Sequence, residues 1–257
     1  MPEGDTIHRI ADRLAPELVG QTLERVTTQG LPRALAGRAV TAVAAHGKHL
    51  AIELDDGTEI RAHLGMYGRF RRFPRTAGEA VLARTSPGRA RLVLVTATGV
   101  YLWLGARVEI SARRAPRHGQ AIAALGPDIL GDAFDSRQAA SRARLHPTRT
   151  IGDVLLDQRV VAGIGNIYRS EALFVSRLDP HTPIAKLADD RLAALYTAAR
   201  DLMLENRARA PFVYDRGGQP CPGCGGAISC TSFGTPARWL WWCPRCQPPG
   251  TEPGDGC

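Results

Sequence analysis

The first residues of the chain could carry out covalent chemistry on an aldehyde-like carbon. Loss of the initiator Met1, which a small second residue permits, would leave Pro2 with a secondary amine. Such an amine can attack the carbon to give an iminium, and an α-amino group titrating at about 7.7–8.0 is partly free base at neutral pH. Glu3 follows directly and would lie within reach of the same carbon as a proton donor. The alternative is an ordinary chain start in front of a helix.

Four cysteines near the end of the chain have the spacing of a metal site. Cys221 and Cys224 form one Cys-x-x-Cys pair, and Cys243 and Cys246 form a second pair after eighteen intervening residues. Two such pairs at this separation are typical of tetrahedral zinc. Four thiolates fill the coordination sphere and leave no position for a substrate. The sequence therefore predicts one structural zinc ion, which would hold a hairpin too short to have its own core.

The segment of residues 65–75 combines an apolar pair with four arginines and no acid. Met66 and Tyr67 lie between two glycines, and Arg69 begins the basic run. One interpretation is a loop whose apolar tip enters a base stack while the arginines contact phosphates. The other is a strand end with Met66 and Tyr67 in the core and the arginines solvated. The residues alone leave both open.

A glycine-rich turn in the second half is a further candidate. Gly163 and Gly165 allow a tight turn, and Asn166 could cap the helix that follows. The amides at such a helix start can bind phosphate. The alternative is a turn in which Asn166 is only a cap.

Charge and composition favour a polyanionic partner. The formal net charge is +8 and the pI is near 9.6. Only Lys48 and Lys186 are lysines, so a lysine retained at position 48 stands out among arginines. The sequence shows no apolar run long enough for a membrane span and no signal peptide, which predicts a soluble, cytoplasmic protein that does not bind membranes.

The apolar pattern predicts the elements that would position these side chains. Residues 5–18 have helical periodicity, with Asp5 or Thr6 as the capping residue. From residue 22 to 110 the period is two, which is typical of a sandwich or barrel. Hairpins are predicted at residues 49–64 and 91–104.

The second half is predicted to be helical and to follow a linker at residues 111–127. A length of 257 residues also favours two domains over one. The predicted helices cover residues 136–145, 151–158, 166–174 and 187–206.

Taken together, these segments resemble the formamidopyrimidine-DNA glycosylase and endonuclease VIII family. They occur in the family's order along nearly the whole chain. The matching segments are Pro2-Glu3-Gly4-Asp5-Thr6, Gly47-Lys48-His49-Leu50, Gly163 to Tyr168, and Cys221-x2-Cys224 through Arg238 to Cys243-Pro-Arg-Cys246-Gln247.

The resemblance implies an α+β multidomain fold. An N-terminal two-layer β-sandwich with flanking helices (residues 1–115) would precede a linker and helix–two-turns–helix domain (116–215). A four-cysteine zinc finger (216–250) and a disordered tail (251–257) would follow. DNA would bind between the two halves of a monomer.

The resemblance also implies roles for single residues. Pro2 would be the Schiff-base nucleophile and Glu3 the general acid at the sugar. Lys48, Asn166 and Arg238 would contact phosphates. Met66 and Tyr67 fall where the family's wedge enters the gap left by an extruded nucleotide.

The implied activity is that of a bifunctional DNA glycosylase and abasic-site lyase of base excision repair. The Glu3-Gly4-Asp5-Thr6 start and Gly152 are similar to the endonuclease VIII branch, which favours oxidised pyrimidines. Ala45-His46 stands where the family often has arginines, so one phosphate contact could be missing. The alternatives are an enzyme that acts mainly as an abasic-site lyase or on oxidised purines, and a non-catalytic zinc-ribbon DNA-binding protein.

Overall fold

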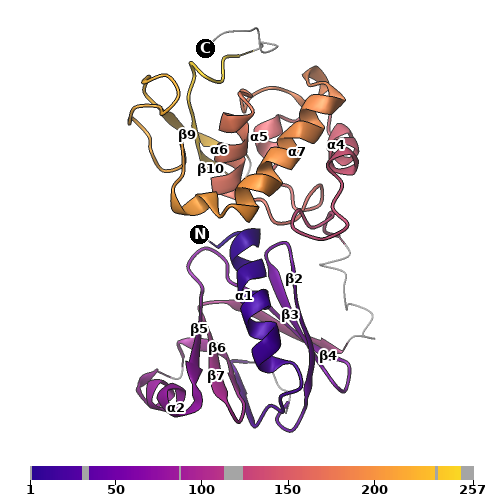
Figure 1. The fold of residues 1–257 in the computed structure, drawn as a ribbon, viewed down its shortest axis with the longest axis vertical. Helices are drawn as coiled ribbons and strands as arrows, with labels where there is room; N and C mark the ends of the chain where they lie inside the picture. Colours follow the sequence, from indigo (N-terminus) through magenta and orange to yellow (C-terminus); the bar gives the residue numbers. More distant parts are fainter. Residues whose placement is uncertain (1, 31–34, 87, 113–123, 235–236, 250–257) are drawn as a thin grey trace. The chain divides into compact units, whose positions relative to one another are not determined.

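The computed structural model describes residues 2–30, 35–86, 88–112, 124–234 and 237–249. The chain forms two compact units, Met1–Ala123 and Ala124–Cys257, which are considered separately below (Figure 1). The predicted tail at 251–257 and most of the predicted linker lie outside the described residues. Among the described helices, none is both long and apolar enough to cross a membrane.

The N-terminal unit contains two antiparallel four-stranded sheets, in the orders β1-β6-β7-β5 and β2-β3-β4-β8. The strands are β1 (Arg25–Thr28), β2 (Val40–His46), β3 (His49–Leu54), β4 (Thr58–His63), β5 (Arg69–Pro74), β6 (Ala90–Val95), β7 (Gly99–Leu104) and β8 (Arg107–Ala112). Their inward-facing side chains share one core, with Ile52 and Ile60 from one sheet and Leu92, Leu94 and Trp103 from the other. The predicted sandwich and both predicted hairpins are confirmed.

Helix α1 (Gly4–Leu18) packs on β2 and β3 through the apolar stripe that the sequence predicts. Ile7, Leu14 and Leu18 are buried on that face. The predicted cap is wrong, because Glu3 is the N-cap residue and no side chain caps the helix. Asp5 instead forms an ion pair with Arg9, with 2.9 Å between Oδ2 and Nη2.

Two elements of the N-terminal unit differ from the sequence prediction: helix α2 was not predicted, and β8 is longer than predicted. Helix α2 (Arg75–Arg84) has a weakly amphipathic sequence and buries only Gly78 among its residues, so it gives no clear helical period. Strand β8 extends to Ala112, into the predicted linker, because it pairs with β4 along its length.

The C-terminal unit is helical and ends in a two-stranded hairpin (Figure 1). Its elements are α4 (Ser136–Arg144), α5 (Ile151–Val154), α6 (Asn166–Val175), the 3-10 helix η1 (Ile184–Lys186), α7 (Asp189–Leu204), the 3-10 helix η2 (Arg207–Arg209), β9 (Ser229–Phe233) and β10 (Arg238–Trp242). Helix α5 ends four residues before the predicted end, because the chain turns at residues 155–158.

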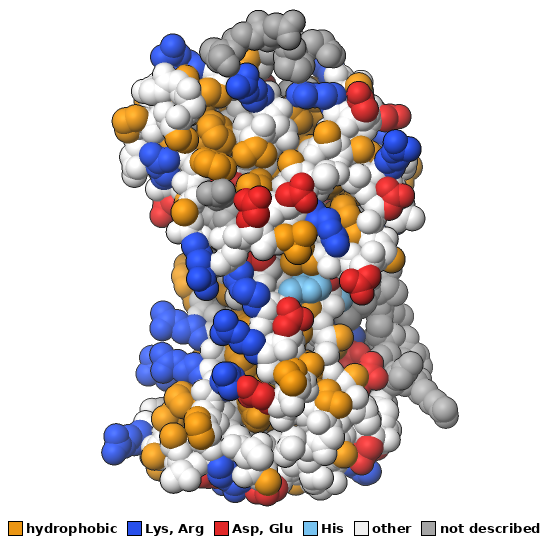
Figure 2. Space-filling view, viewed as in Figure 1, with side chains coloured by type: hydrophobic (Ala, Val, Ile, Leu, Met, Phe, Trp, Pro, Cys, Tyr) orange, Lys and Arg blue, Asp and Glu red, His pale blue; other side chains and the backbone are white. Residues whose placement is uncertain are grey.

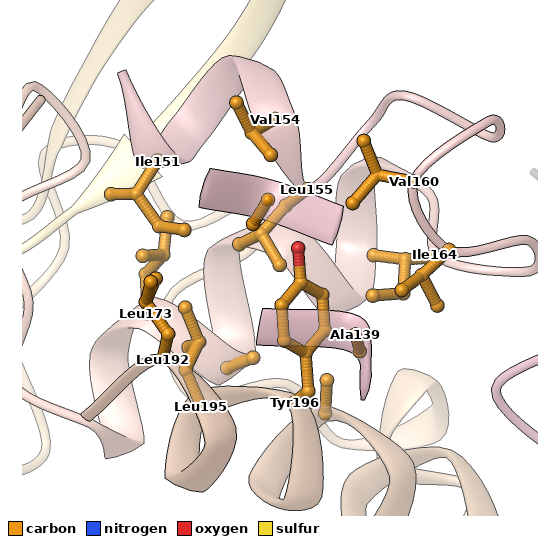
Figure 3. Close-up of a cluster of buried hydrophobic side chains, with 14 of the residues drawn as sticks. Ala139, Ile151, Val154, Leu155, Val160, Ile164, Leu173, Leu192, Leu195 and Tyr196 are labelled. Carbon is orange, nitrogen blue, oxygen red and sulfur yellow. The ribbon is translucent and has the colours of Figure 1, made fainter. Parts of the chain in front are cut away.

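The helices surround a core in which Tyr196 of α7 lies among Leu155, Val160 and Ile164 (Figure 3). Buried Glu171 of α6 adds a polar anchor to this unit. Its carboxylate accepts three backbone N–H groups, from Phe212, Val213 and Tyr214, at 2.6 to 2.9 Å. Glu171 therefore fixes the segment that leads into the cysteine region.

Candidate functional site

Pro2 and Glu3 lie at the start of α1. The carbonyl of Glu3 accepts the N–H groups of Thr6 and Ile7, at 3.1 and 3.2 Å. Pro2 is half-buried, and Glu3 is 1% exposed. The positive end of a helix disfavours protonation of a nearby amine, so a terminal amine on Pro2 would be kept more nucleophilic there. Glu3, the next residue, carries a buried carboxyl, a group suited to proton transfer.

Lys48 occupies the tight turn between β2 and β3. His46 pairs with His49, so Gly47 and Lys48 alone form the loop. Gly47 has φ of 55°, the conformation required of the first residue in a type II′ turn. The lysine is therefore held on a rigid two-residue connection of the sheet that α1 covers.

Two histidines form a pair beside this turn. The rings of His49 and His63 are 4.9 Å apart between centroids, on neighbouring strands β3 and β4. Burial lowers the pKa of His49 to about 4, helped by nearby His63 and Arg61. His63 Nδ1 accepts the N–H of Gly65 at 3.0 Å, which requires an unprotonated Nδ1. His63 thus anchors the start of the following loop.

That loop, residues 65–68, presents its apolar tip to solvent. Met66 is 46% exposed and Tyr67 is 86% exposed, so neither belongs to the core. Gly65 has φ of 63°, and a Cβ on Gly68 would lie 2.0 Å from the carbonyl oxygen of Leu64. Both glycines are therefore required by the backbone of this turn.

Arg69 follows the loop as the first residue of β5 and is exposed. Figure 2 shows Lys and Arg side chains gathered over the part of the N-terminal unit where Figure 1 places β5. Two arginines of residues 65–75 form ion pairs: Arg72 of β5 with Glu17, and Arg75, the first residue of α2, with Glu24. This surface joins an exposed apolar tip to a basic strand.

In the C-terminal unit, Asn166 is the first residue of α6 and is buried. The predicted capping role is wrong, because Gly165 is the N-cap residue. Asn166 Nδ2 instead donates to the carbonyl oxygen of Trp239 in β10 at 2.7 Å. One of the two amide hydrogens remains for another acceptor.

Arg169, one turn along α6, was not singled out from the sequence. It is fully buried. Its Nη2 donates to Asn166 Oδ1 at 2.5 Å and to the Trp239 carbonyl oxygen at 2.7 Å, and its guanidinium lies 5.8 Å from the Phe233 ring centre. In the sequence, its position three residues after Asn166, and therefore on the same face of α6, was the feature that could have pointed to it. Arg169 thus links Asn166 to the hairpin.

The glycine turn before α6 is held by a glutamine. Gly163 has φ of 112°, and its N–H donates to Gln158 Oε1 at 3.1 Å. The Gln158 amide donates in return to the carbonyl oxygen of Ile164 at 2.9 Å. The predicted tight turn is present.

The four predicted cysteines converge. Their sulfur atoms all lie within 4.8 Å of one another, with 3.7 Å from Cys221 to Cys246 and 3.5 Å from Cys224 to Cys243. A tetrahedral ion with metal–sulfur bonds of about 2.3 Å separates its sulfurs by about 3.8 Å. The N–H of Gly226 lowers the pKa of Cys224 to about 7, with Cys246 contributing. The cluster can hold a metal ion, and β9 and β10 lie between its two pairs.

Gln247 attaches the cysteine cluster to the helices. Its Oε1 accepts the N–H of Cys243 at 2.9 Å, and its Nε2 donates to the carbonyl oxygen of Leu178 at 2.8 Å. Arg238, the first residue of β10, is exposed and pairs with Phe233 across the hairpin. Arg238 and the carbonyl that Asn166 binds are therefore on adjacent residues.

Two family models match these two units. The formamidopyrimidine-DNA glycosylase N-terminal domain matches residues 1–105, and the formamidopyrimidine-DNA glycosylase H2TH domain matches residues 125–209. The chain belongs to the formamidopyrimidine-DNA glycosylase and endonuclease VIII family.

Within this family the chain is similar to proteins of both branches. A probable endonuclease 8 2 of Streptomyces coelicolor is 35% identical over 99% of this chain and 97% of that protein. The DNA-(apurinic or apyrimidinic site) lyase Nei2 of Mycolicibacterium smegmatis is 36% identical over 96% of this chain and 99% of that protein. The crystal structure of MutM (Fpg) from Thermus thermophilus has a TM-score of 0.80 and 30% identity, covering 97% of this chain and all of that one.

Proposed function

We propose that this protein is a DNA glycosylase and abasic-site lyase of base excision repair, with the Pro2 amine as nucleophile. The observation that carries the proposal is the buried carboxyl of Glu3, directly after Pro2 at the positive end of α1. An amine and a proton donor on neighbouring residues are what covalent catalysis at a sugar carbon requires, which supports the proposal. Relatives named endonuclease 8 and abasic-site lyase support the same activity.

The reaction begins when the Pro2 nitrogen attacks C1′ of an extruded nucleotide and the bond to the damaged base breaks. The base leaves with a proton, and the sugar ring opens to give an iminium. The iminium withdraws electrons, so a proton is lost from C2′ and the C3′–O bond breaks, expelling the 3′ phosphate. A second elimination takes a proton from C4′ and breaks the C5′–O bond. Glu3 donates and accepts protons at the sugar, and water releases the enzyme.

The remaining proposed residues hold the DNA. Lys48, Asn166 and Arg238 bind phosphates of the damaged strand, and Arg69 adds a further contact. Exposed Met66 and Tyr67 fill the gap that the extruded nucleotide leaves. The protein acts as a monomer on DNA in the cytoplasm and favours oxidised pyrimidines.

The metal of the four-cysteine cluster is proposed to be zinc. The donor set of four thiols and the sulfur separations fit tetrahedral Zn²⁺. Such an ion has a full coordination sphere and would stabilise the β9–β10 hairpin that carries Arg238. No catalytic step passes through it.

Borohydride trapping tests the nucleophile. The full-length protein is mixed with duplex DNA containing an oxidised pyrimidine or an abasic site, and the reduced adduct is mapped by mass spectrometry. We expect the adduct on the Pro2 nitrogen. An adduct found only on Lys48 would reject the proposed nucleophile.

Glu3→Gln tests the proton donor, with Glu17→Gln at the far end of α1 as a matched control. Glu3→Gln should lose base excision by about 10²–10⁴-fold while retaining much of the cleavage at preformed abasic sites. Glu17→Gln should retain both activities. Equal losses in the two variants would mean that Glu3 has no specific role. Excision rates across oxidised pyrimidines and purines would establish which lesions are preferred.

A further inference from the structure

The end of strand β9 packs closely against the short helix α5. Phe233 is the last residue of β9, and a Cβ on Gly152 of α5 would lie 2.9 Å from the Phe233 ring. A Cβ on Gly234, the next residue of the hairpin, would lie 2.3 Å from Oδ1 of Asp153, the next residue of α5. Two consecutive residues of the hairpin therefore meet two consecutive residues of the helix, and a glycine on each side permits this close approach.

Two further side chains flank the Phe233 ring. The His181 imidazole meets it edge to face, with 5.0 Å between the ring centres and 85° between the ring planes. The Arg169 guanidinium lies 5.8 Å from the centre of the same ring. Edge-to-face contact is an arrangement that aromatic pairs prefer, so these neighbours hold the ring in a defined orientation. The proposed function assigns Phe233 no role.

Phe233 lies directly opposite Arg238 in the β9–β10 hairpin. The two residues are paired in register, so their side chains project from the same face, with Cβ atoms about 4.5–5.5 Å apart. Leu240, two residues along β10 and therefore on this face, is fully buried. Arg238 is exposed at the end of the same face. The position of the Arg238 backbone thus depends on how Phe233 is held.

The four-cysteine cluster alone does not fix this end of the hairpin. Cys243 follows β10 directly, and Arg238 stands five residues earlier, about 17 Å away along an extended strand. The hydrogen bonds that the Trp239 carbonyl oxygen accepts from α6 hold β10 at one further atom. A rigid hairpin held at two points can still turn about the line that joins them. Phe233 supplies the third contact, on the other strand.

We propose that Phe233 is the positioning residue for Arg238: packed against Gly152, it fixes the direction in which Arg238 meets a DNA phosphate. The inference rests on the proposed function, in which Arg238 is a phosphate ligand. It has a specific consequence, because removal of an uncharged side chain should lower the number of ionic contacts with DNA. Loss of packing elsewhere in the hairpin should not have this effect.

The test measures the affinity of the full-length protein for a duplex with a non-cleavable tetrahydrofuran abasic analogue at several salt concentrations. In Arg238→Ala, the slope of log affinity against log salt concentration should fall by about 0.9 in magnitude, because one phosphate contact is lost. Phe233→Ala should lower the slope by the same amount, although it removes no charge. The double variant should have the slope of Arg238→Ala, because Phe233 acts through Arg238.

Gly152→Ala tests the same contact from the side of the helix. It retains both Phe233 and Arg238, but its added Cβ would displace the ring, so the slope should fall as in Phe233→Ala. Gly152→Ala also decides the question if Phe233→Ala does not fold. Tyr214→Leu is the matched control, because it removes the ring that packs on Trp241, on the opposite face of the hairpin, with 4.6 Å between ring centres. Tyr214→Leu should keep the wild-type slope.

A wild-type slope in either Phe233→Ala or Gly152→Ala, beside a lowered slope in Arg238→Ala, would reject the positioning role alone. Additive changes of slope in the double variant, or a slope in Tyr214→Leu as low as in Phe233→Ala, would also reject it. A wild-type slope in Arg238→Ala would reject both the phosphate contact of Arg238 and its positioning by Phe233. The catalytic part of the proposed function is judged separately, by the borohydride adduct on Pro2.

Discussion

Replacing Arg169 with methionine tests whether a buried cation holds Asn166 in its binding orientation. Arg169 Nη2 donates to Asn166 Oδ1 at 2.5 Å and to the Trp239 carbonyl oxygen at 2.7 Å. Methionine is flexible and of similar length, so it fills much of the space while removing the charge and the donors. The substitution therefore removes the hydrogen bonds of the guanidinium together with its charge and its contact with the Phe233 ring.

The expected loss of stability is modest because opposing effects partly cancel. Two hydrogen bonds from a charged donor are worth about 1.5–3 kcal/mol each. Against this, a buried guanidinium carries a desolvation penalty of several kcal/mol that methionine avoids. Asn166 Nδ2 still donates to Trp239, so that carbonyl keeps one partner. We expect the free energy of unfolding to fall by about 1–3 kcal/mol.

Arg169→Met should weaken DNA binding through the loss of the proposed contact between Asn166 and a phosphate. If Asn166 no longer presents its remaining amide hydrogen, one neutral hydrogen bond to a phosphate is lost and the dissociation constant should rise by about twofold to tenfold, the equivalent of about 0.5–1.5 kcal/mol. Fluorescence titration with a tetrahydrofuran-containing duplex at one fixed salt concentration measures this constant. Asn166→Ala should give the same dissociation constant as Arg169→Met, and the double variant should add nothing.

Arg200→Met provides a matched control in the same unit. Arg200 donates to backbone carbonyl oxygens, including that of Gly131 at 3.0 Å, and lies 5.5 Å from the Phe134 ring centre. It should lose stability as Arg169→Met does but keep the wild-type affinity for DNA. A wild-type affinity in Arg169→Met, or additive effects in the double variant, would refute the positioning of Asn166 by Arg169.

Three other predictions follow from single sites. Cys243→Ser, or chelation of the metal, should unfold the hairpin and abolish specific DNA binding, seen as a change in tryptophan fluorescence with stoichiometric metal release. His49 has a folded pKa of about 4 against an ordinary value of 6.5, so below pH 6.5 the unfolded chain takes up a proton that the folded chain does not. The free energy of unfolding should therefore fall by about 1–2 kcal/mol as the pH drops from about 6.5 to 4, after a discount for solvent screening. In His49→Phe, urea titrations should show a free energy of unfolding that depends less on pH over this range. Gly152→Ala should lower the free energy of unfolding by about 1–3 kcal/mol, because the added Cβ would lie 2.9 Å from both the Phe233 ring and the Pro180 carbonyl oxygen. Thermal unfolding measures this loss. An unchanged melting temperature would show that the contact between Gly152 and the hairpin is loosely packed.

The sequence by itself determined the features that depend on local spacing. Two Cys-x-x-Cys pairs predict a cluster of four cysteines that can hold a metal ion, because the two thiols of each short pair can bind the same ion. The alternating pattern of residues 49–64 determined a hairpin and its buried face, since side-chain direction in a strand has a period of two. The apolar stripe of α1 could also be predicted, because side-chain direction in a helix repeats every 3.6 residues.

Only the tertiary structure decided features that depend on residues far apart in the chain. Whether Met66 and Tyr67 lie in the core or in solvent depends on how β4 and β5 leave their sheets, and no local pattern encodes this. The cap of α6 was misassigned because Asn166 lies inside the helix, where its Oδ1, the atom that a cap would use, accepts from Arg169. Its Nδ2 donates to the carbonyl oxygen of Trp239, 73 residues away. Arg169 is charged but fully buried, because the fold encloses it between α6 and the hairpin, and no local pattern predicts this. Local spacing specifies the chemistry that residues can perform, whereas packing between distant segments specifies which of them are held in position to perform it.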